Sequence, residues 1–288
     1  MIENLVNGLV LGGTYALVAM GLTIQYGIAR IMNLAFGDLI IAACFGTFVL
    51  YSGFALSPVL ALFLIVPLGF AFNYFIYQIV MRPLVARAPN SEALEVDSIL
   101  VTFGLLFVIQ GILLVIFGGA YTSYSYLNTP VNVLGTIVAA NRLVAFVLAL
   151  IFGAGILFVL FRTRWGTTLR AVALAPESAP LYGIDVNASA RLAFAIGGAL
   201  AASGGVVVSM YQTFTATAGV VFTMKALIVV ILGGKGSLTG ALVAGLLLGV
   251  VETMVAAYID PGLTLAATYT VFLLLLLVRP SGMFGKAG

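Results

Sequence analysis

The chain has 288 residues, of which 63% are hydrophobic and 7% are charged, and its formal net charge is +3. A soluble domain carries about a quarter charged residues, so this composition predicts a polytopic membrane protein. The sequence contains no histidine and one cysteine, which excludes His-ligated metal sites, His-based catalytic triads and an intrachain disulfide. No basic run or stacking-aromatic pattern indicates a nucleic-acid partner.

The hydrophobic runs predict an all-α integral membrane protein, because about 20 apolar residues cross a bilayer as one helix. We expect a polytopic helical bundle of eight or nine spans, with broken or re-entrant helices and short cytoplasmic coupling helices. No linker divides the chain, so residues 1–288 are expected to form a single transmembrane domain. The expected spans lie near 5–29, 34–51, 58–80, 98–118, 142–161, 191–211, 223–258 with an interruption, and 262–278.

Loop charges predict the orientation, since cytoplasmic loops carry the excess of Lys and Arg. The basic residues fall in alternate loops, which are therefore expected to be cytoplasmic. The N-terminus is then extracytoplasmic and the C-terminus cytoplasmic. In the opposite loops the sequence has no Lys or Arg, and Arg142 lies only at a membrane edge. The loops expected inside contain Arg82 and Arg87, the four arginines from Arg162 to Arg191, and Arg279 with Lys286.

The first span contains Gly8 and Gly12, a small-xxx-small pair that permits close helix contact. Polar residues follow it directly, between two apolar runs. Ionisable groups at membrane depth are costly and usually face a protein interior or a cavity, so Asn33 and Asp38 are candidates for a translocation path. The alternative is a short inner turn between two spans, in which Arg30 is the counter-charge of Asp38.

A long polar segment, about 162–190, separates two later spans. Within it, Leu169, Val172 and Ala173 fall at helical spacing, which predicts a short amphipathic helix ending before Pro176. Pro176 and Gly183 would bracket a second short turn of helix, because Pro suits a first helical position and Gly a C-terminal cap. Such a helix pair could receive a soluble partner, although an ordinary charged inner loop also fits the pattern.

The outer loop from Gly118 to Asn141 contains Tyr121, Tyr124 and Tyr126. Tyrosines of this kind are typical of the aromatic belt at a membrane interface. They could also help to dock a partner outside the membrane.

A glycine cluster interrupts the apolar run of residues 223–258, which predicts a broken or re-entrant helix. The cluster is not a phosphate-binding loop, because Lys235 is followed by Gly236 where a Walker A motif needs Ser or Thr. A tight inner turn fits better, and Glu252 further on is a third candidate for the translocation path. The predicted broken-helix turn consists of Gly233, Gly234 and Gly236.

Four stretches together resemble the membrane-spanning permease subunits of branched-chain amino acid ABC importers. They are NGLVLGGTYALVAMGLTIQYGIARIMNLAFGDL, GTTLRAVALAPESAPLYGIDV, MKALIVVILGGKGSLTGALVAGLLLGVVE and RPSGMFG. The resemblance implies a multi-pass protein of the bacterial inner membrane, surrounded by lipid and paired with a second permease subunit, as a heterodimer or alternatively a homodimer. It also implies two cytoplasmic ATPase subunits and an extracytoplasmic solute-binding protein. ATP and Mg would be bound by the ATPases, and this chain would bind no cofactor.

The resemblance also assigns residues of the segment 162–190. The chain departs from the family at Phe36, where Asn33-Leu34-Ala35-Phe36-Gly37 replaces a common Asn-Phe-Ala-His-Gly, and at Pro176, where a polar residue is common. The implied solute is a branched-chain amino acid or a related small polar or organic molecule. The positions that match the family's ATPase-coupling segment are Gly166, Arg170, Ala171, Glu177, Ala179 and Gly183.

Three other classes of function remain alternatives. An ion-coupled secondary transporter without ATPase partners would also have broken helices and deep charges such as Asp38, Lys225 and Glu252. A structural scaffold for a membrane complex is a second alternative. An intramembrane enzyme fits poorly, because a lone Cys44 and scattered carboxylates provide no catalytic or metal-binding set.

Overall fold

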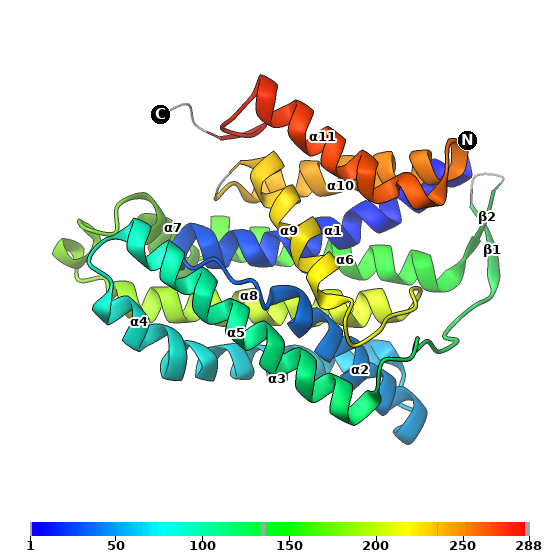
Figure 1. Cartoon of the computed structure of the whole chain (residues 1–288), viewed down its shortest axis with the longest axis horizontal. Helices are drawn as coiled ribbons and strands as arrows, with labels where there is room; N and C mark the ends of the chain where they lie inside the picture. Colours follow the sequence, from blue (N-terminus) through cyan, green and yellow to red (C-terminus); the bar gives the residue numbers. More distant parts are fainter. Residues whose placement is uncertain (1, 134–135, 235, 286–288) are drawn as a thin grey trace.

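A computed structural model describes residues 2–133, 136–234 and 236–285 of the chain, and it confirms the predicted helical membrane fold (Figure 1). Eight helices in the described part are long and apolar enough to cross a membrane. They are α1 (Ile2–Ala29), α2 (Phe36–Phe54), α3 (Pro58–Ile76) with its continuation, α5 (Ser91–Phe117), α6 (Ala140–Arg162), α8 (Val186–Ser209), α10 (Leu238–Tyr258) and α11 (Thr264–Val278).

Shorter elements connect these helices. The π-helical turn η1 (Tyr77–Met81) and α4 (Arg82–Arg87) extend α3, and η3 (Pro261–Leu263) precedes α11. The helix α9 is only 15 residues long and so spans about 22 Å, less than the roughly 30 Å of a bilayer core. The predicted interruption of the run 223–258 is therefore confirmed as the break between α9 and α10. The remaining elements are α7 (Arg164–Leu174), η2 (Ala179–Tyr182), α9 (Gly219–Gly233), β1 (Pro130–Val133) and β2 (Thr136–Ala139).

The helix α1 lies inside the bundle, against α10, α8 and α6 (Figure 1). A Cβ added at Gly12 would overlap the backbone of Leu246 in α10, and one added at Gly249 would overlap Gly12. Glycine at these positions lets the two backbones approach closely. The predicted small-residue contact at Gly8 and Gly12 is therefore confirmed, with α10 as the partner helix.

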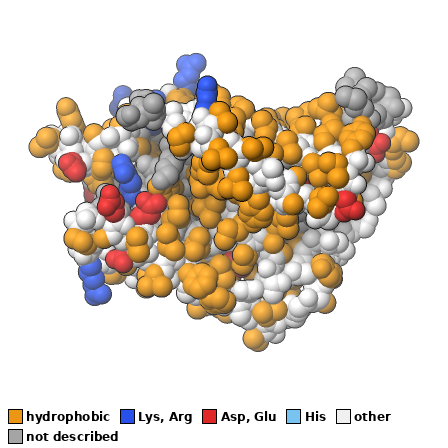
Figure 2. All heavy atoms as spheres, turned by 45° about the horizontal axis from the view of Figure 1, so that its top comes forward, with side chains coloured by type: hydrophobic (Ala, Val, Ile, Leu, Met, Phe, Trp, Pro, Cys, Tyr) orange, Lys and Arg blue, Asp and Glu red, His pale blue; other side chains and the backbone are white. Residues whose placement is uncertain are grey.

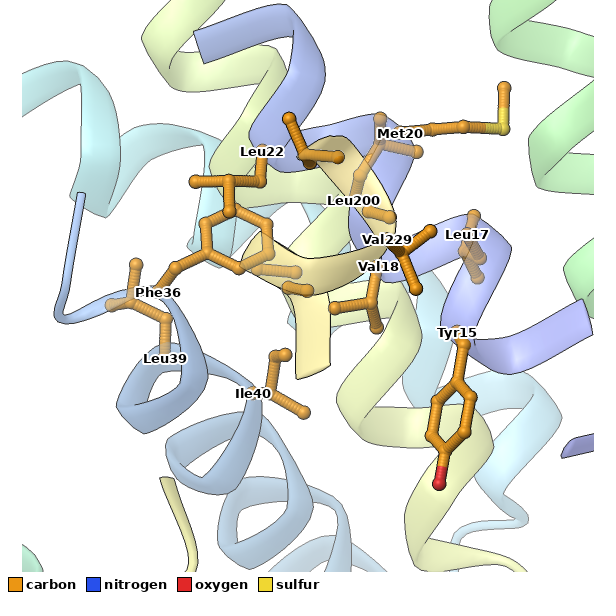
Figure 3. Packing of buried hydrophobic residues seen from close by; sticks show 14 of the residues in the cluster. Tyr15, Leu17, Val18, Met20, Leu22, Phe36, Leu39, Ile40, Leu200 and Val229 are labelled. Atoms are coloured by element: carbon orange, nitrogen blue, oxygen red, sulfur yellow. The ribbon is translucent and has the colours of Figure 1, made fainter. Parts of the chain in front are cut away.

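The bundle has inner and outer helices. Side chains from α1, α2, α8 and α9, among them Leu17, Phe36 and Leu200, form a buried hydrophobic core (Figure 3). The outer helices α3, α5 and α11 instead expose large apolar side chains such as Phe63, Val115 and Leu277. Exposed apolar side chains surrounding a core are the arrangement that a lipid environment favours.

The two ends of the bundle differ in charge. Figure 1 shows that α4, α7 and the last turn of α11 lie in the same half of the bundle, on the left, which we call the basic end. All Lys and Arg side chains visible in Figure 2 lie in the corresponding half of that view. The basic end carries Arg82, Arg87, Arg164 and Arg279, as the loop charges predicted, whereas Lys286 lies outside the described residues. The first turn of α1 and the β1–β2 hairpin lie at the opposite end, the hairpin end.

Two connections expected as loops are structured. The polar residues before 98 belong to α5, because the Asn90 side chain accepts a hydrogen bond from the Ala93 amide at 2.7 Å and caps the helix. The outer loop contains an antiparallel hairpin in which Pro130 pairs with Ala139. Valine, isoleucine and threonine in these strands favour extended backbone, which explains why this part of the outer loop forms a hairpin.

Candidate functional site

The helix α7 is held against the end of α6 by a glycine. The Thr163 side chain caps α7 by accepting a hydrogen bond from the Gly166 amide at 3.1 Å. A Cβ at Gly166 would overlap the carbonyl oxygens of Val159 and Leu160. The predicted apolar face is confirmed, since Leu169 and Val172 are buried.

The predicted second turn of helix is present, but it begins later than expected. Pro176 lies in the turn after α7, and Pro180 occupies the early position of η2 that was assigned to Pro176. Gly183 ends η2 in the left-handed region with φ of 73°, and its amide donates to the carbonyls of Ala179 and Pro180. This is the C-terminal glycine cap expected at Gly183.

The segment 164–183 presents apolar side chains outward as well as charges. Arg170 is exposed, with its guanidinium 5.3 Å from the ring centre of Phe161, and Glu177 is also exposed. Ala179 is buried, and Ala171 is half-buried. Beside these residues, large apolar side chains are more than half exposed. An exposed apolar patch of this kind marks an interaction surface rather than a loop that contacts only water. These side chains are Trp165, Leu174, Leu181 and Tyr182.

The break between α9 and α10 is a tight turn at the basic end. Gly234 and Gly236 have φ of 99° and 79°, a region that side-chain-bearing residues rarely adopt. Gly233 lies so close to Gly240 that a Cβ on either would overlap the other's backbone. The structure therefore brings Gly233, Gly234 and Gly236 together as predicted, while Lys235 lies outside the described residues.

The C-terminal segment packs against this turn, which the sequence reading did not anticipate. The amides of Met283 and Phe284 donate to the carbonyls of Leu232 and Gly233 at 2.8 and 3.1 Å. Gly282, with φ of 80°, lies against Gly234. These bonds satisfy carbonyl groups at the end of α9 that have no partner within the helix. The stretch RPSGMFG thus stabilises the break.

The residues between α1 and α2 form a short non-helical segment that ends in a turn before α2. Asn33 is fully buried, donates to Gln25 Oε1 at 3.2 Å and accepts from the Ala35 amide at 3.1 Å. The Leu34 amide donates to Thr102, and the hydroxyl of Thr223 in α9 donates to the Leu34 carbonyl at 3.0 Å. Side chains thereby replace the hydrogen bonds that a helix would supply.

Asp38 lies in the first turn of α2 and is fully buried, whereas Arg30 is exposed at the end of α1. Within the described residues neither Asp38 oxygen has a hydrogen-bond partner, and no ion pair joins it to Arg30. The counter-charge alternative for Arg30 is therefore wrong. The carboxylate instead lies against Gly219, where a Cβ would overlap it, at the start of α9.

Glu252 lies in a buried polar cluster inside the bundle. It accepts hydrogen bonds from the Tyr15 hydroxyl at 2.8 Å and from the Lys225 ammonium at 2.5 Å. Lys225 also donates to the Tyr15 oxygen at 2.6 Å. Figure 3 shows the Tyr15 hydroxyl directed away from the labelled aliphatic side chains. Sequence reading missed the role of Tyr15 as the third member of this cluster.

In the described part of the chain, no hydrogen bond joins the three path candidates to one another, but Asp38, Glu252 and the residue after Asn33 all contact α9. Leu34, which follows Asn33, bonds Thr223 in the first turns of α9, Asp38 lies against Gly219, and Glu252 pairs with Lys225 two residues after Thr223. Thr223 was not singled out from the sequence, because a single threonine in an apolar run gives no local signal. Among the described residues no His, Cys, Asp and Glu cluster could hold a metal ion.

Phe36, at the position where the resemblance leads one to expect histidine, is an apolar core residue. Its side chain is fully buried, and its ring tip reaches the space beside Gly21 and Leu200 (Figure 3). This part of the bundle is therefore apolar in the present chain.

Residues 4–279 match the family described as "Branched-chain amino acid transport system / permease component". The permease protein LivH of Salmonella typhimurium is 28% identical over 99% of this chain and 96% of the relative. BraD of Pseudomonas aeruginosa is 29% identical over 99% and 96%, and the probable LivH of Methanocaldococcus jannaschii is 25% identical over 84% and 77%. No solved structure matches the chain significantly.

The match covers the segment 164–183, the break between α9 and α10 and the three path candidates, and it ends at Arg279, before the C-terminal residues that pack against the break. It identifies a transport subunit rather than an enzyme, and one of an ABC importer rather than the ion-coupled transporter considered as an alternative. Permeases of such importers work with ATPase and solute-binding partners. The chain is a multi-pass membrane protein that belongs to the family of permease components of branched-chain amino acid transport systems.

Proposed function

We propose that this subunit imports branched-chain amino acids across a bacterial inner membrane. LivH and BraD, the relatives that align with 99% of the chain, are named for high-affinity transport of these solutes. The buried polar groups of the bundle, set among apolar side chains, suit a solute that has a charged head group and an apolar tail. The alternative is a related small polar or organic solute. Measuring uptake of leucine, isoleucine and valine distinguishes the two.

The segment 164–183 is the proposed site of ATPase coupling. The observation that carries this assignment is the exposure of Trp165, Leu174, Leu181 and Tyr182 beside charged residues at the basic end. An apolar patch with a polar rim is typical of a protein interface. The ATPase subunits would bind ATP and Mg, and this chain would bind neither. On this proposal the basic end is cytoplasmic, and the N-terminus is extracytoplasmic.

The short helix α9 is the proposed link between coupling and the path. Its last turn meets the glycine break at the basic end, and its first turns contact Leu34, the residue after Asn33, and Asp38 inside the bundle. In discontinuous membrane helices such half-helix ends lie at solute sites. A displacement at the basic end would thus alter the surroundings of Asp38 and Glu252, which are proposed to line the path.

The proposed assembly contains a second, different permease subunit, two ATPases and an extracytoplasmic solute-binding protein. Purification of the subunit in mild detergent from its native host tests the composition. Recovery of a second permease chain together with two ATPase chains supports a heterodimer. Recovery of this chain as the single permease species contradicts it.

Reconstituted vesicles test the function directly. The intact assembly is expected to take up leucine, isoleucine and valine only when ATP is supplied on the ATPase side. Gly183→Val is expected to uncouple ATP hydrolysis from uptake, because a β-branched residue is strained at φ of 73°. Gly183→Asn is the matched control, since asparagine tolerates the left-handed region. Normal coupling in Gly183→Val would contradict the coupling assignment.

A further inference from the structure

The hairpin end contains a cavity of about 530 Å³ that none of the path residues described above lines. It is formed by the first turns of α1, the loop and hairpin before α6, the start of α6 and the chain just after α8. This volume is within the range of about 300–1,000 Å³ typical of small-molecule sites. The lining residues that matter for its chemistry are Glu3, Tyr124, Val138, Asn141, Arg142 and Met210.

Arg142 supplies a positive charge at this end. Among the Lys and Arg residues of the described chain, it alone lies at the hairpin end, where the distribution of loop charges disfavours a cation. Its side chain is half-buried, and within the described residues its guanidinium donates one hydrogen bond, to Asn7 Oδ1 at 2.8 Å. No carboxylate of the described residues forms an ion pair with it. A guanidinium has five N–H donors, so most of them remain available to a carboxylate.

Asn141 and Glu3 supply acceptors beside this cation. Asn141 is 9% exposed; its amide nitrogen donates to the Met210 carbonyl at 3.0 Å, while its buried Oδ1 has no partner among the described residues. Buried polar atoms without a partner are rare in folded proteins. Glu3 is exposed on the cavity wall and adds a negative charge. The cavity therefore presents a cation together with the acceptors of Asn141 and Glu3.

The rest of the lining is largely polar, but two of its residues are apolar and one of its walls continues into the bundle. Val138 and Met210 are buried apolar residues of the lining. Tyr124 bonds to the Ser209 hydroxyl at 2.8 Å, and burial raises the pKa of Tyr124 above its usual value, so this wall stays uncharged. On another wall, the Tyr211 hydroxyl donates to Thr14 at 2.9 Å, one residue from the Tyr15 that bonds Glu252.

We propose that this cavity binds a free zwitterionic α-amino acid on the permease subunit itself, before the solute passes into the bundle. Arg142 binds the α-carboxylate, Asn141 Oδ1 and Glu3 accept hydrogen bonds from the α-ammonium group, and the apolar side chain lies toward Val138 and Met210. The substrate class rests on the proposed function, whereas the head-group chemistry follows from the cavity.

Binding of tritiated L-leucine to the full-length subunit in lipid nanodiscs tests the site. Two analogues of leucine test the two charged groups separately: 4-methylpentanoate lacks the ammonium group, and 3-methylbutylamine lacks the carboxylate. Each is expected to compete at least about tenfold less well than leucine, because a charge-assisted hydrogen bond is lost. Equal competition by both analogues would overturn the proposal, as would the absence of leucine binding.

Substitutions assign the binding to named residues. Arg142→Gln is expected to weaken leucine binding by about tenfold to a hundredfold, and Arg142→Lys by less, since it keeps the charge. Arg279→Gln, at the basic end, is the matched control and should bind as the unaltered protein does. If Arg142→Gln does not fold, Glu3→Gln at an exposed position serves instead and should lower the preference for leucine over 4-methylpentanoate. Unchanged leucine binding in Arg142→Gln, or an unchanged preference in Glu3→Gln, would overturn the assignment.

Two further outcomes separate this inference from the proposed function. Leucine uptake by the intact transporter without leucine binding to the subunit would overturn the inference alone. Head-group-dependent leucine binding to the subunit without leucine uptake would support the site and contradict the proposed function.

A loss of solute-binding-protein capture in Arg142→Gln, with leucine binding intact, would show that the cavity receives a protein segment and would overturn the inference.

Discussion

Lys225 and Glu252 form an ion pair inside the bundle, with 2.5 Å between Nζ and Oε1, and join the short helix α9 to α10. Both side chains are almost fully buried, and the Tyr15 hydroxyl completes the cluster. Burying two charges in this way costs desolvation free energy that only good geometry offsets. The ion pair therefore adds little net free energy of folding. Its main effect is to hold α9 in a fixed position against α10.

Removal of one partner of this pair is expected to destabilise the subunit. Lys225→Met leaves Glu252 buried with only the Tyr15 hydroxyl, which lowers the free energy of unfolding by about 3–5 kcal/mol. The double variant Lys225→Met/Glu252→Leu should recover most of this loss, because no uncompensated charge remains. Thermal unfolding in nanodiscs measures both effects. Equal destabilisation of the single and double variants would contradict this account.

Leucine uptake by the double variant tests the role of Glu252 in the path. If Glu252 lines the path, the double variant should regain stability while uptake remains low. Recovery of both stability and uptake would assign the pair a structural role only.

Asp38 is expected to respond differently, because its carboxylate has no partner among the described residues. Asp38→Asn keeps the shape and removes the charge, so the thermal unfolding temperature should be unchanged or higher. Uptake should nevertheless fall by at least about tenfold, since the proposed path loses a negative charge that attracts the ammonium group of a passing solute. Ser52→Ala, at an exposed site on the same helix, is the control. Full uptake by Asp38→Asn would remove Asp38 from the path.

Local patterns in the sequence predicted the features that depend on local geometry. Gly183 could be recognised as a left-handed cap, and Gly8 with Gly12 as a close contact, because each signal lies within a few residues. The cluster of Tyr15, Lys225 and Glu252 could not be predicted, since it joins residues far apart in the chain through tertiary packing. The packing of the C-terminal segment could not be predicted either, because its contacts with Leu232 and Gly233 are backbone hydrogen bonds that produce no pattern in the sequence.

Gly166 is expected to be intolerant of any side chain. Gly166→Ala places a methyl group against the carbonyls of Val159 and Leu160, which costs about 1–3 kcal/mol or displaces α7. Gly155→Ala in α6 is the matched control, because nothing lies near its added Cβ. ATPase stimulation by the reconstituted assembly should fall in Gly166→Ala and stay normal in Gly155→Ala. Equal stimulation in both variants would show that the position of α7 does not affect coupling.

Gly282 is expected to control the stability of the break between α9 and α10. Gly282→Val introduces strain at φ of 80° and overlap with the Gly234 backbone, so the amides of Met283 and Phe284 should lose their bonds to Leu232 and Gly233. Amide hydrogen exchange at the end of α9 should then accelerate, because its carbonyl groups and backbone open to solvent. Gly118→Val is the control that separates backbone strain from steric overlap. Gly118 has φ of 73° but open space around it, so valine there introduces strain without overlap. If exchange at the end of α9 is the same in Gly282→Val as in the unaltered protein, the C-terminal segment does not hold the break.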